Sequence, residues 1–342
     1  MKYKGIEICC PSCRSDLEQS GGELKCLRCP REYPIIAGIP DLRLFPDPYI
    51  DMEADRKKGL QVEARMGELN FSELVDYYYS MTSVVPPQHA RQYKSGLLAA
   101  VDRAKASLSV WHAASGAGGG QAASVLDVGC GTAPLLVAAA PYAKRLVGVD
   151  VAFRWLMIGK KRLLEAGLDI PLFCACAEAL PFPDGEFDRV ILDSSIEHWT
   201  SQQKGLEECH RVMRSGGHLF LSTPNRFSLG PDPHMGVPAG GYWPKRWQAA
   251  YARRQGAIPP KRNLLWKRSL VRLTSAAGFS KTRLLLPQIS EAQRRQASRP
   301  VKHLADLYQA LQKLPLSHHL LFLIGPALLA VARKPEAPKH QP

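Results

Sequence analysis

Residues 124–134 constrain the fold of this chain more than any other stretch of its sequence. Residues 124–128 are mostly apolar and predict a buried strand, and the Ala- and Leu-rich segment that begins at Pro134 predicts a helix directly after it. Between them, Gly129 and Gly131 let the backbone approach a ligand without a clash from a Cβ atom. Open α/β sheets bind nucleotide-type ligands at such strand-to-helix turns. We therefore expect a cofactor site here.

The alternation of strands and helices continues along the chain. The further elements expected from the pattern are strands at residues 145–150, 172–176, 189–193 and 218–222 and helices near residues 155–166 and 204–213. Repeated alternation predicts a parallel sheet with helices on both faces, so the expected fold class is α/β. Residues 282–286 and 327–332 are expected to form a terminal antiparallel pair, with an insertion at residues 288–320 between them.

An acidic residue at the end of the second strand, Asp150, supports the same site. It follows the glycine turn by about 20 residues, which is the separation at which dinucleotide-binding folds place their ribose-binding acid. A carboxylate can accept hydrogen bonds from both hydroxyls of a ribose. Ala133 and Pro134 leave the pyrophosphate-binding pattern of three glycines incomplete, which disfavours a nicotinamide dinucleotide.

Residues 124–225 resemble the class I, Rossmann-like methyltransferases, particularly their type 11 group. The resemblance is carried by the loop at residues 127–131, by Asp150, and by the segments at residues 177–182, 187–190 and 210–217. It implies that the cofactor is S-adenosyl-L-methionine. The residues that it places around this cofactor are Asp127, Gly129, Cys130, Gly131, Asp150, Val151, Ala177, Glu178 and Asp193.

Cys176 departs from the family pattern. Many members have an aspartate here that accepts a hydrogen bond from the adenine amino group, and a thiol is a poor acceptor. The resemblance then implies that adenine relies on backbone groups near Ala177 and on Glu178. The alternative interpretation of Glu178 is a solvated acid in a surface loop.

Candidate residues for the reaction and for the acceptor follow the fourth and fifth strands. Methyl transfer from a sulfonium requires in-line geometry and a deprotonated acceptor. His198 is the candidate general base, because histidine titrates near neutrality, and the alternative is that it only caps or packs its loop. Asn225, Arg226 and His234 are candidate contacts to the acceptor, because loops at this edge of a sheet commonly bind substrate.

Four cysteines near the N-terminus have the spacing of a metal site. Cys10 and Cys13 form one Cys-x-x-Cys pair, and Cys26 and Cys29 form a second pair after 12 intervening residues. Four thiolates close a tetrahedral Zn²⁺ site of the structural type, and so short a segment benefits from a metal because it buries little apolar core. Loss of the metal and disulfide formation are the alternatives, and a reducing compartment disfavours disulfides.

This block resembles the zinc-ribbon family of tRNA-methyltransferase activators. The resemblance rests on Cys10-Pro11-x-Cys13, on the second cysteine pair and on the ending at residues 33–40. It implies a module that partners or regulates a methyltransferase. Certain rRNA guanine methyltransferases also carry an N-terminal zinc module, but its last ligand is typically a histidine where this chain has Cys29.

The net charge of +14 is concentrated in the C-terminal third. Residues 241–342 contain 19 Lys and Arg residues against three acids, Glu291, Asp306 and Glu336, so the other 240 residues have a net charge of −2. This balance indicates an anionic partner, which the sequence leaves open between RNA, a phosphorylated substrate and an anionic membrane surface. A solvated basic surface without a specific ligand is the alternative.

The sequence suggests three parts: a zinc ribbon at residues 1–45, a proline-punctuated linker with a helical cap at residues 46–120, and a Rossmann-like domain at residues 121–342 with its basic insertion at about 288–320. The N-terminus lacks the apolar core of a signal peptide. The longest apolar run, residues 320–331, is interrupted by Gly325-Pro326 and is shorter than a membrane span. We expect a cytoplasmic protein without a transmembrane segment, and peripheral attachment to a membrane is left open.

Three functions are compatible with these features. The first is a methyltransferase that acts on a small-molecule, lipid-linked or sugar-linked acceptor. The second is an RNA methyltransferase of the rRNA type, which the basic C-terminal third favours. The third is a non-catalytic scaffold whose zinc ribbon binds a partner protein, and the intact Gly129, Gly131 and Asp150 argue against it.

Overall fold

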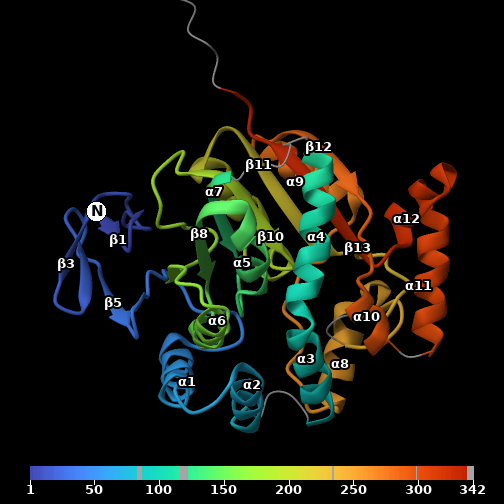
Figure 1. Cartoon of the computed structure of the whole chain (residues 1–342), viewed down its shortest axis with the longest axis horizontal. Coiled ribbons are helices and arrows are strands. Elements are labelled where there is room, and N and C mark those ends of the chain that lie inside the picture. Colours follow the sequence, from blue (N-terminus) through green and yellow to red (C-terminus); the bar gives the residue numbers. More distant parts are fainter. Residues whose placement is uncertain (83–86, 116–121, 233–234, 298, 337–342) are drawn as a thin grey trace, which may run out of the picture.

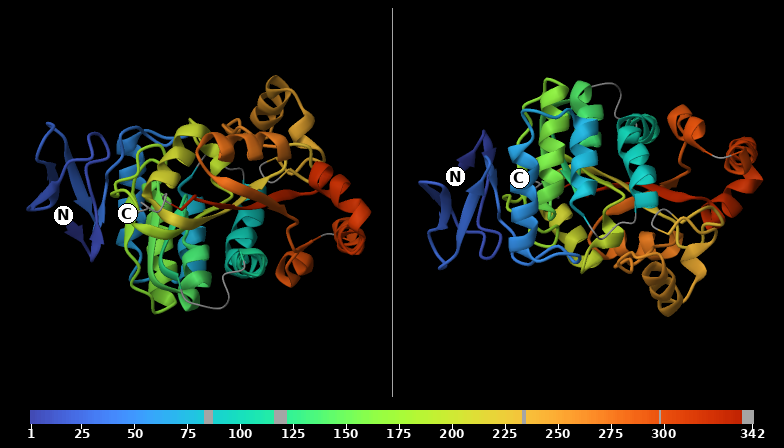
Figure 2. Two further views of the ribbon diagram at one scale, coloured as in Figure 1. Left: turned by 90° about the horizontal axis from the view of Figure 1, so that it is seen from above. Right: turned by 90° about the horizontal axis from the view of Figure 1, so that it is seen from below.

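The computed structural model describes residues 1–82, 87–115, 122–232, 235–297 and 299–336 of the chain. A small N-terminal ribbon lies at one end, a sheet covered by helices forms the centre, and a group of C-terminal helices lies at the opposite end (Figure 1, Figure 2). Within the described ranges, no helix combines the length and the apolar character that crossing a bilayer requires.

The N-terminal ribbon consists of short antiparallel strands. They are β1 (Lys2–Tyr3), β2 (Ile6–Glu7), β3 (Leu17–Ser20), β4 (Glu23–Cys26), β5 (Glu32–Ile36) and β6 (Ile39–Pro40). β1 pairs with β2, and β3 to β6 form a second sheet in sequential order. The ribbon extends the central sheet at its edge strand β9 (Leu172–Cys174), because Asp41 bridges to Cys174 and the Leu42 amide donates to the Cys174 carbonyl at 2.7 Å.

The central sheet combines parallel strands with a terminal antiparallel pair, as the sequence predicted. Its other strands are β7 (Ala122–Val128), β8 (Ala143–Asp150), β10 (Phe187–Asp193), β11 (Met213–Pro224), β12 (Ser280–Leu285) and β13 (Ala327–Arg333). The strand order is β12-β13-β11-β10-β7-β8-β9, in which β13 is antiparallel to both β11 and β12. The chain runs outward from β7 to β9 and then returns to β10 on the other side of β7. The point where strand order reverses therefore lies between β7 and β10, at the glycine turn.

Helices cover both faces of this sheet. They are α5 (Pro134–Ala139), α6 (Phe153–Glu165), α7 (Gln202–Val212) and α9 (Lys267–Ala276), with 3-10 turns η1 (Ala140–Tyr142) and η2 (Ile196–His198). Adjacent residues of β7 enter opposite cores. Leu126 belongs to the core that includes residues of α7, α9 and the ribbon, and Val125 to the core that includes α5 and α6. Burial on both faces explains why this strand is apolar without alternation, and the α/β class is confirmed.

Four helices precede the sheet and cover its α5–α6 side. They are α1 (Met52–Ala64), α2 (Phe71–Ser80), α3 (Pro87–Leu98) and α4 (Ala100–Ser115). Gly59 lets α1 lie directly on α6, because a Cβ there would come within 2.3 Å of the Phe153 ring. Asn70 and Glu73 begin α2 with a capping box.

The remaining elements lie at the end opposite the ribbon. They are η3 (Gly240–Tyr242), α8 (Lys245–Arg254), α10 (Glu291–Gln296), α11 (Arg299–Gln312), η4 (Pro315–Ser317) and α12 (His318–Ile324). Helices α10 to α12 connect β12 to β13, in the segment where the sequence indicated an insertion.

Candidate cofactor and acceptor site

The turn after β7 makes a close contact with the segment that follows β10. Gly129 has a φ of +82°, a conformation that favours glycine. A Cβ at this position would lie 2.2 Å from the Cβ of Ser195. The Ser195 hydroxyl fixes the contact by donating to the Val128 carbonyl at 2.8 Å. Glycine at position 129 is therefore required by the approach of a protein loop, and not only by a ligand.

Asp150 ends β8 with its carboxylate turned toward the same glycine turn. The Gly131 amide donates to one carboxylate oxygen and the Ala152 amide to the other, each at 2.8 Å. Burial raises the pKa of Asp150 to about 6, although the two amide donors act in the opposite direction. Because each carboxylate oxygen has two lone pairs, Asp150 can still accept hydrogen bonds from the hydroxyls of a ligand.

These groups line a cavity of about 310 Å³, which we call the cofactor cavity. Its walls come from the carboxyl ends of the strands, from the segment that follows β10 and from residues 45–49. The predicted cofactor residues that line it are Gly129, Gly131, Asp150, Val151, Ala177 and Glu178.

The other three predicted cofactor residues are not among those that line the cavity. Asp127 is buried, and its Oδ2 has no hydrogen-bond partner within the described part of the chain. Burial, followed by the nearby Asp193 and Asp150, raises the pKa of Asp127 well above its usual value. Asp193 accepts a hydrogen bond from the Ser222 hydroxyl, and Cys130 is buried. A direct contact of these side chains with the cofactor stays a prediction.

Residues 45–49, which the sequence placed at the end of the ribbon and the start of the linker, form one wall of the cofactor cavity. They are anchored by buried ion pairs. Arg43 pairs with Asp55 at 2.7 Å, Asp55 pairs with Arg154 at 2.7 Å, and Arg154 reaches Asp47 at 3.2 Å. Removing one member of such a network would leave a buried charge uncompensated, so the network fixes the segment against α6. No local sequence pattern indicates these pairings, because the partners are up to 107 positions apart.

Cys176 and Glu178 both have protein partners. The Cys176 thiol donates to the Phe45 carbonyl at 3.5 Å, and burial raises the pKa of this thiol to about 11. Glu178 is only 5% exposed and accepts a hydrogen bond from the Ser201 amide at 3.1 Å. The alternative interpretation of Glu178 as a solvated acid is therefore wrong.

A second cavity, of about 540 Å³, adjoins the first, and we call it the aromatic cavity. Four side chains line both cavities: Tyr49, Arg154, Trp155 and His198. The further aromatic residues around the second cavity are Tyr78, Tyr79, Tyr93 and Tyr251. These residues come from α2, α3 and α8 as well as from α6 and the segment before α1. No single window of the sequence contains them, and sequence reasoning missed this cavity.

His198 lies at the junction of the two cavities, at the end of η2. Burial lowers its pKa, and Arg262 acts in the same direction, although a hydrogen bond with the Lys261 backbone raises it. The imidazole packs edge-on against the ring of Tyr49, with centroids 6.4 Å apart. A neutral imidazole in this position can accept a proton from a group in either cavity.

Of the predicted acceptor contacts, Asn225 and Arg226 line neither cavity. The buried amide of Asn225 donates to the carbonyls of Phe322 and Leu323, at 3.3 and 3.0 Å, which ties the loop after β11 to α12. Arg226 is exposed, with its guanidinium 5.6 Å from the centre of the Phe227 ring. His234 lies outside the described residues. Roles for these side chains in acceptor binding stay predictions. The Asn225 amide already has hydrogen-bond partners within the protein.

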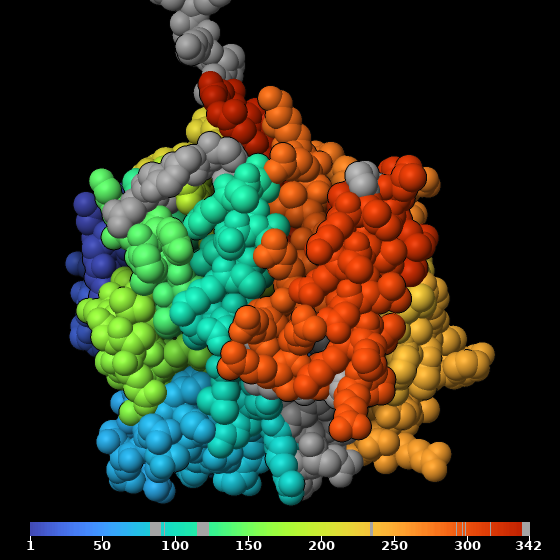
Figure 3. Space-filling model, turned by 45° about the vertical axis from the view of Figure 1, so that its right-hand side comes forward, coloured from blue at the N-terminus to red at the C-terminus, as the bar shows by residue number. Residues whose placement is uncertain are grey.

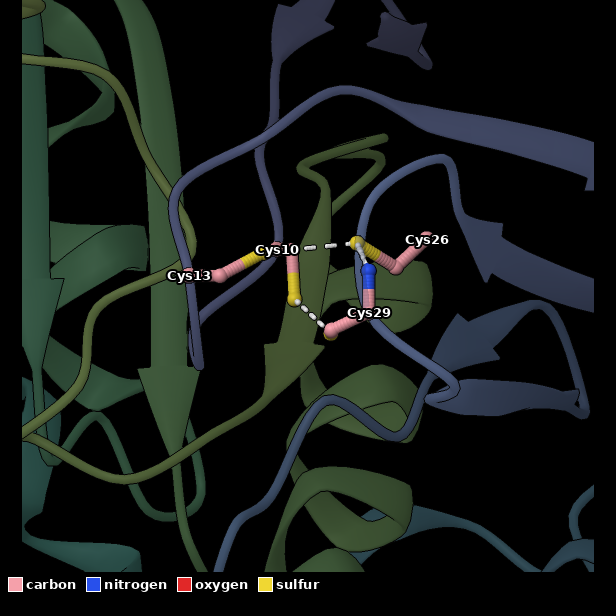
Figure 4. A group of neighbouring side chains, drawn as sticks. All are labelled: Cys10, Cys13, Cys26 and Cys29. Atoms are coloured by element: carbon pink, nitrogen blue, oxygen red, sulfur yellow. Dashed lines mark hydrogen bonds between the residues drawn. The ribbon is translucent and has the colours of Figure 1, made fainter.

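The four cysteines of the ribbon converge from the turn before β3 and the turn after β4 (Figure 4). Their sulfur atoms lie within 4.8 Å of one another, with 3.4 Å between Cys13 and Cys26 and 3.7 Å between Cys10 and Cys29. Four sulfurs at about 2.3 Å from a tetrahedral zinc are about 3.8 Å apart, so the cluster has suitable dimensions. The amides of Arg28 and Cys29 both donate to the Cys26 sulfur at 3.4 Å. Such donors orient a thiolate toward a metal.

Residues 126–221 match the family Methyltransf_11, described as a methyltransferase domain. This range includes the glycine turn, Asp150 and the segment that follows β10. The match and the strand order agree with the resemblance to class I methyltransferases that the sequence motifs indicated, and confirm it over these residues.

Individual relatives match over a limited length. The ubiquinone/menaquinone biosynthesis C-methyltransferase UbiE of Bordetella avium is 38% identical over 103 residues, which are 28% of this chain and 39% of that protein. A demethylmenaquinone methyltransferase of Bacteroides fragilis is 30% identical over 112 residues, or 31% of this chain and 46% of that protein. The chain thus spans less than half the length of these relatives. A solved S-adenosylmethionine-dependent methyltransferase of Thermotoga maritima, described as a possible histamine N-methyltransferase, has a TM-score of 0.46 at 16% identity over 72% of this chain and 96% of that one.

Proposed function

We propose that this protein transfers a methyl group from S-adenosyl-L-methionine to an aromatic, apolar small molecule. The observation that carries the proposal is the junction of the two cavities, where His198, Tyr49 and Trp155 line both. A cofactor in the first cavity and an acceptor in the second would meet at these side chains. Among the acceptors that the sequence left open, a ring-bearing molecule, with or without a lipid tail, suits the aromatic wall better than a sugar-linked one.

The cofactor cavity offers S-adenosyl-L-methionine a hydrogen-bond acceptor and an open glycine turn. Asp150 presents a carboxylate that can accept from the two ribose hydroxyls. A Cβ added to Gly131 would meet nothing within 4 Å, so this part of the turn is open to a ligand. Ala177 and Glu178 line the side on which the family resemblance expects adenine. When bound, the cofactor supplies a methyl group that its sulfonium has already activated.

The residues at the junction and Tyr78 of the aromatic cavity have two tasks in this proposal. Tyr78 and Trp155, whose ring centres are 4.7 Å apart, orient a flat acceptor by aromatic contact. His198 takes the proton from the acceptor group, because burial lowers the pKa of its imidazole and keeps it neutral. Alignment of the acceptor with the methyl group then provides most of the remaining rate enhancement.

The relatives support the choice of acceptor class. One is named for ubiquinone and menaquinone biosynthesis and the other for demethylmenaquinone, and such quinones are apolar ring compounds. Their match covers less than half of each protein, so the acceptor is inferred chiefly from the aromatic cavity of this chain.

We also propose one structural Zn²⁺ ion per chain, held by Cys10, Cys13, Cys26 and Cys29. The spacing of the four sulfur atoms and the amide donors to Cys26 support this assignment. The metal would stabilise the ribbon and, through residues 41–49, the wall that the ribbon contributes to the cofactor cavity.

A labelled-methyl transfer assay on fractionated cell extract tests the proposed function. We expect label in the organic-soluble, ring-containing fraction, and much less of it with the Asp150→Ala variant at a cofactor concentration below the wild-type dissociation constant. Label in RNA would favour the RNA methyltransferase alternative. A folded protein that neither binds S-adenosyl-L-methionine in calorimetric titration nor transfers label would favour the non-catalytic scaffold.

A further inference from the structure

The C-terminal helices expose apolar side chains that the fold does not bury. We call this set the leucine face, and its members are Leu304, Leu307, Leu314, Leu316, Leu320 and Leu323. Their exposed fractions range from 40% to 95%. All belong to α11, η4, α12 and the turn between α11 and η4. In the space-filling view, the orange-red residues of this region form the outer surface of the forward right side (Figure 3).

Helix α11 has a broad apolar face, of which only one edge is packed. Ala305 and Tyr308 are buried toward the protein. Leu304 and Leu307 are more than half exposed and lie three positions apart, on one stripe of the helix. With about 3.6 residues per turn, Leu304 lies beside Tyr308, and Leu307 lies beyond Leu304. The apolar face therefore continues past its buried edge onto the surface, which indicates a contact with something else.

Basic residues lie in the same segment as the leucine face, and two of them, Arg294 and Arg295, pair with Asp306 and Glu291. The cations in residues 288–326 are Arg294, Arg295, Arg299, Lys302 and Lys313, against the two acids Glu291 and Asp306. Helix α8 lies at the same end of the molecule (Figure 2) and exposes further cations together with an indole, namely Lys245, Arg246, Arg253, Arg254 and Trp247. Exposed leucines among lysines and arginines are the composition of helices that lie in the interface of an anionic bilayer.

We propose that the leucine face and helix α8 dock this protein on the surface of an anionic lipid bilayer. The leucines would enter the boundary between headgroups and acyl chains, and the cations would contact the headgroups. RNA fits less well, because phosphate binding makes no use of six exposed leucines. A second copy of the chain fits less well, because two such basic surfaces repel each other.

The position of α8 connects this surface with the aromatic cavity. Tyr251 and Ala252 of α8 line the cavity, whereas Arg253 and Arg254 of the same helix are exposed. Docking through α8 would therefore bring the aromatic cavity close to the bilayer. The proposed docking itself does not depend on the identity of the acceptor or on methyl transfer.

Vesicle co-sedimentation of the full chain tests the proposal. The probes are vesicles of phosphatidylcholine alone and vesicles of phosphatidylcholine and phosphatidylglycerol in equal parts. We expect the protein to bind the anionic vesicles and to bind the neutral vesicles more weakly. Leu307→Asp and Leu316→Asp should each lower the partition coefficient by about tenfold or more, since each removes one inserted leucine. The matched control is Leu164→Asp on α6, where the leucine is 57% exposed, and it should change partition by less than about twofold.

Thermal unfolding of each variant shows whether it folds. Absence of wild-type binding to anionic vesicles would overturn the proposal. Binding that depends on salt but is equal in Leu307→Asp, Leu316→Asp and the control would overturn the role of the leucine face. A wild-type dimer that Leu307→Asp converts to a monomer would assign the face to a second copy. Binding to single-stranded RNA in the absence of vesicle binding would assign the basic surface to nucleic acid.

Discussion

The two adjoining cavities of this protein are built in different ways. The cofactor cavity is formed largely by consecutive strand ends, with Gly129, Gly131 and Asp150 within about one strand–helix–strand unit. The aromatic cavity is formed by side chains from positions 49 to 260, on helices that belong to different parts of the chain. The first is a property of the sheet, and the second is a property of how helices pack around it.

This difference separates the two halves of the proposed reaction. A change in the glycine turn should affect only the binding of the cofactor. A change in the aromatic wall should affect only the binding of the acceptor. The exceptions are Arg154, Trp155 and His198, which line both cavities, and residues 45–49, which contribute to both cavities and are joined to the ribbon. Variants chosen in these three places test whether the separation is real.

Loss of the metal is expected to have the largest effect, because it acts on both cavities through residues 45–49. Structural zinc contributes about 10 kcal/mol in small zinc-binding domains, so Cys26→Ser should lower the unfolding midpoint by about 10 °C or more. Metal analysis should find one zinc ion per wild-type chain and less in the variant. Cys9→Ser, next to the cluster but outside it, is the control and should retain zinc. A folded wild-type protein without zinc would contradict the assignment.

Substitution of Gly129 should abolish cofactor binding. In Gly129→Val, the new Cβ would lie 2.2 Å from that of Ser195, at a φ of +82° that valine rarely adopts. We expect the dissociation constant for S-adenosyl-L-methionine to rise more than about 100-fold in calorimetric titration. Gly131→Ala is the matched control, because its φ is also positive, at +49°, and its Cβ meets nothing. In this control the dissociation constant should rise about tenfold or less. Equal effects of the two variants would show that the close loop contact is unimportant.

Removal of the Asp150 carboxylate should weaken cofactor binding without affecting the aromatic cavity. Hydrogen bonds to a charged group contribute about 1.5 to 3 kcal/mol, so Asp150→Ala should raise the dissociation constant by about tenfold to 100-fold. Titration of the wild type and the variant with S-adenosyl-L-methionine measures this change. An unchanged constant would remove Asp150 from the site.

The pH dependence of cofactor binding should follow the raised pKa of Asp150. Its pKa is about 6, and the ionised form is the better acceptor, so affinity should fall as pH decreases through 6. At pH 5 it should be about tenfold lower than at pH 7, because about nine tenths of the carboxyl groups are then protonated. The Asp150→Asn variant should lose this part of the profile. A profile that persists in the variant would point to another titrating group.

Narrowing of the aromatic cavity should have the smallest effect, and it should weaken only the binding of the acceptor. Ala257 lines this cavity and not the other, so Ala257→Trp should raise the KM for the acceptor about threefold to tenfold by reducing the space. The dissociation constant for S-adenosyl-L-methionine should not change. If cofactor binding weakens as strongly as acceptor binding, the two cavities are not separable.

The sequence was informative wherever function depends on neighbouring residues. The strand–turn–helix around Gly129, the acid at Asp150 and the two cysteine pairs are local patterns, and the structure places their members close together. It was less informative for Asn225, which has a plausible position in a loop but whose amide is bonded to α12. Whether such a side chain bonds to the protein or to a ligand depends on which segment of the chain lies opposite it in the fold.

The sequence by itself determined the α/β class, the order of strands and helices, and a glycine turn suited to a nucleotide-type cofactor. These follow from periodicity and from the steric freedom of glycine, which act over a few residues. Only the tertiary structure decided that residues 45–49 form a cavity wall, that His198 lies where two cavities meet, and that tyrosines from three helices surround the second one. The ion pairs and ring contacts responsible join residues distant in the chain, and such contacts exist only after the helices have packed on the sheet.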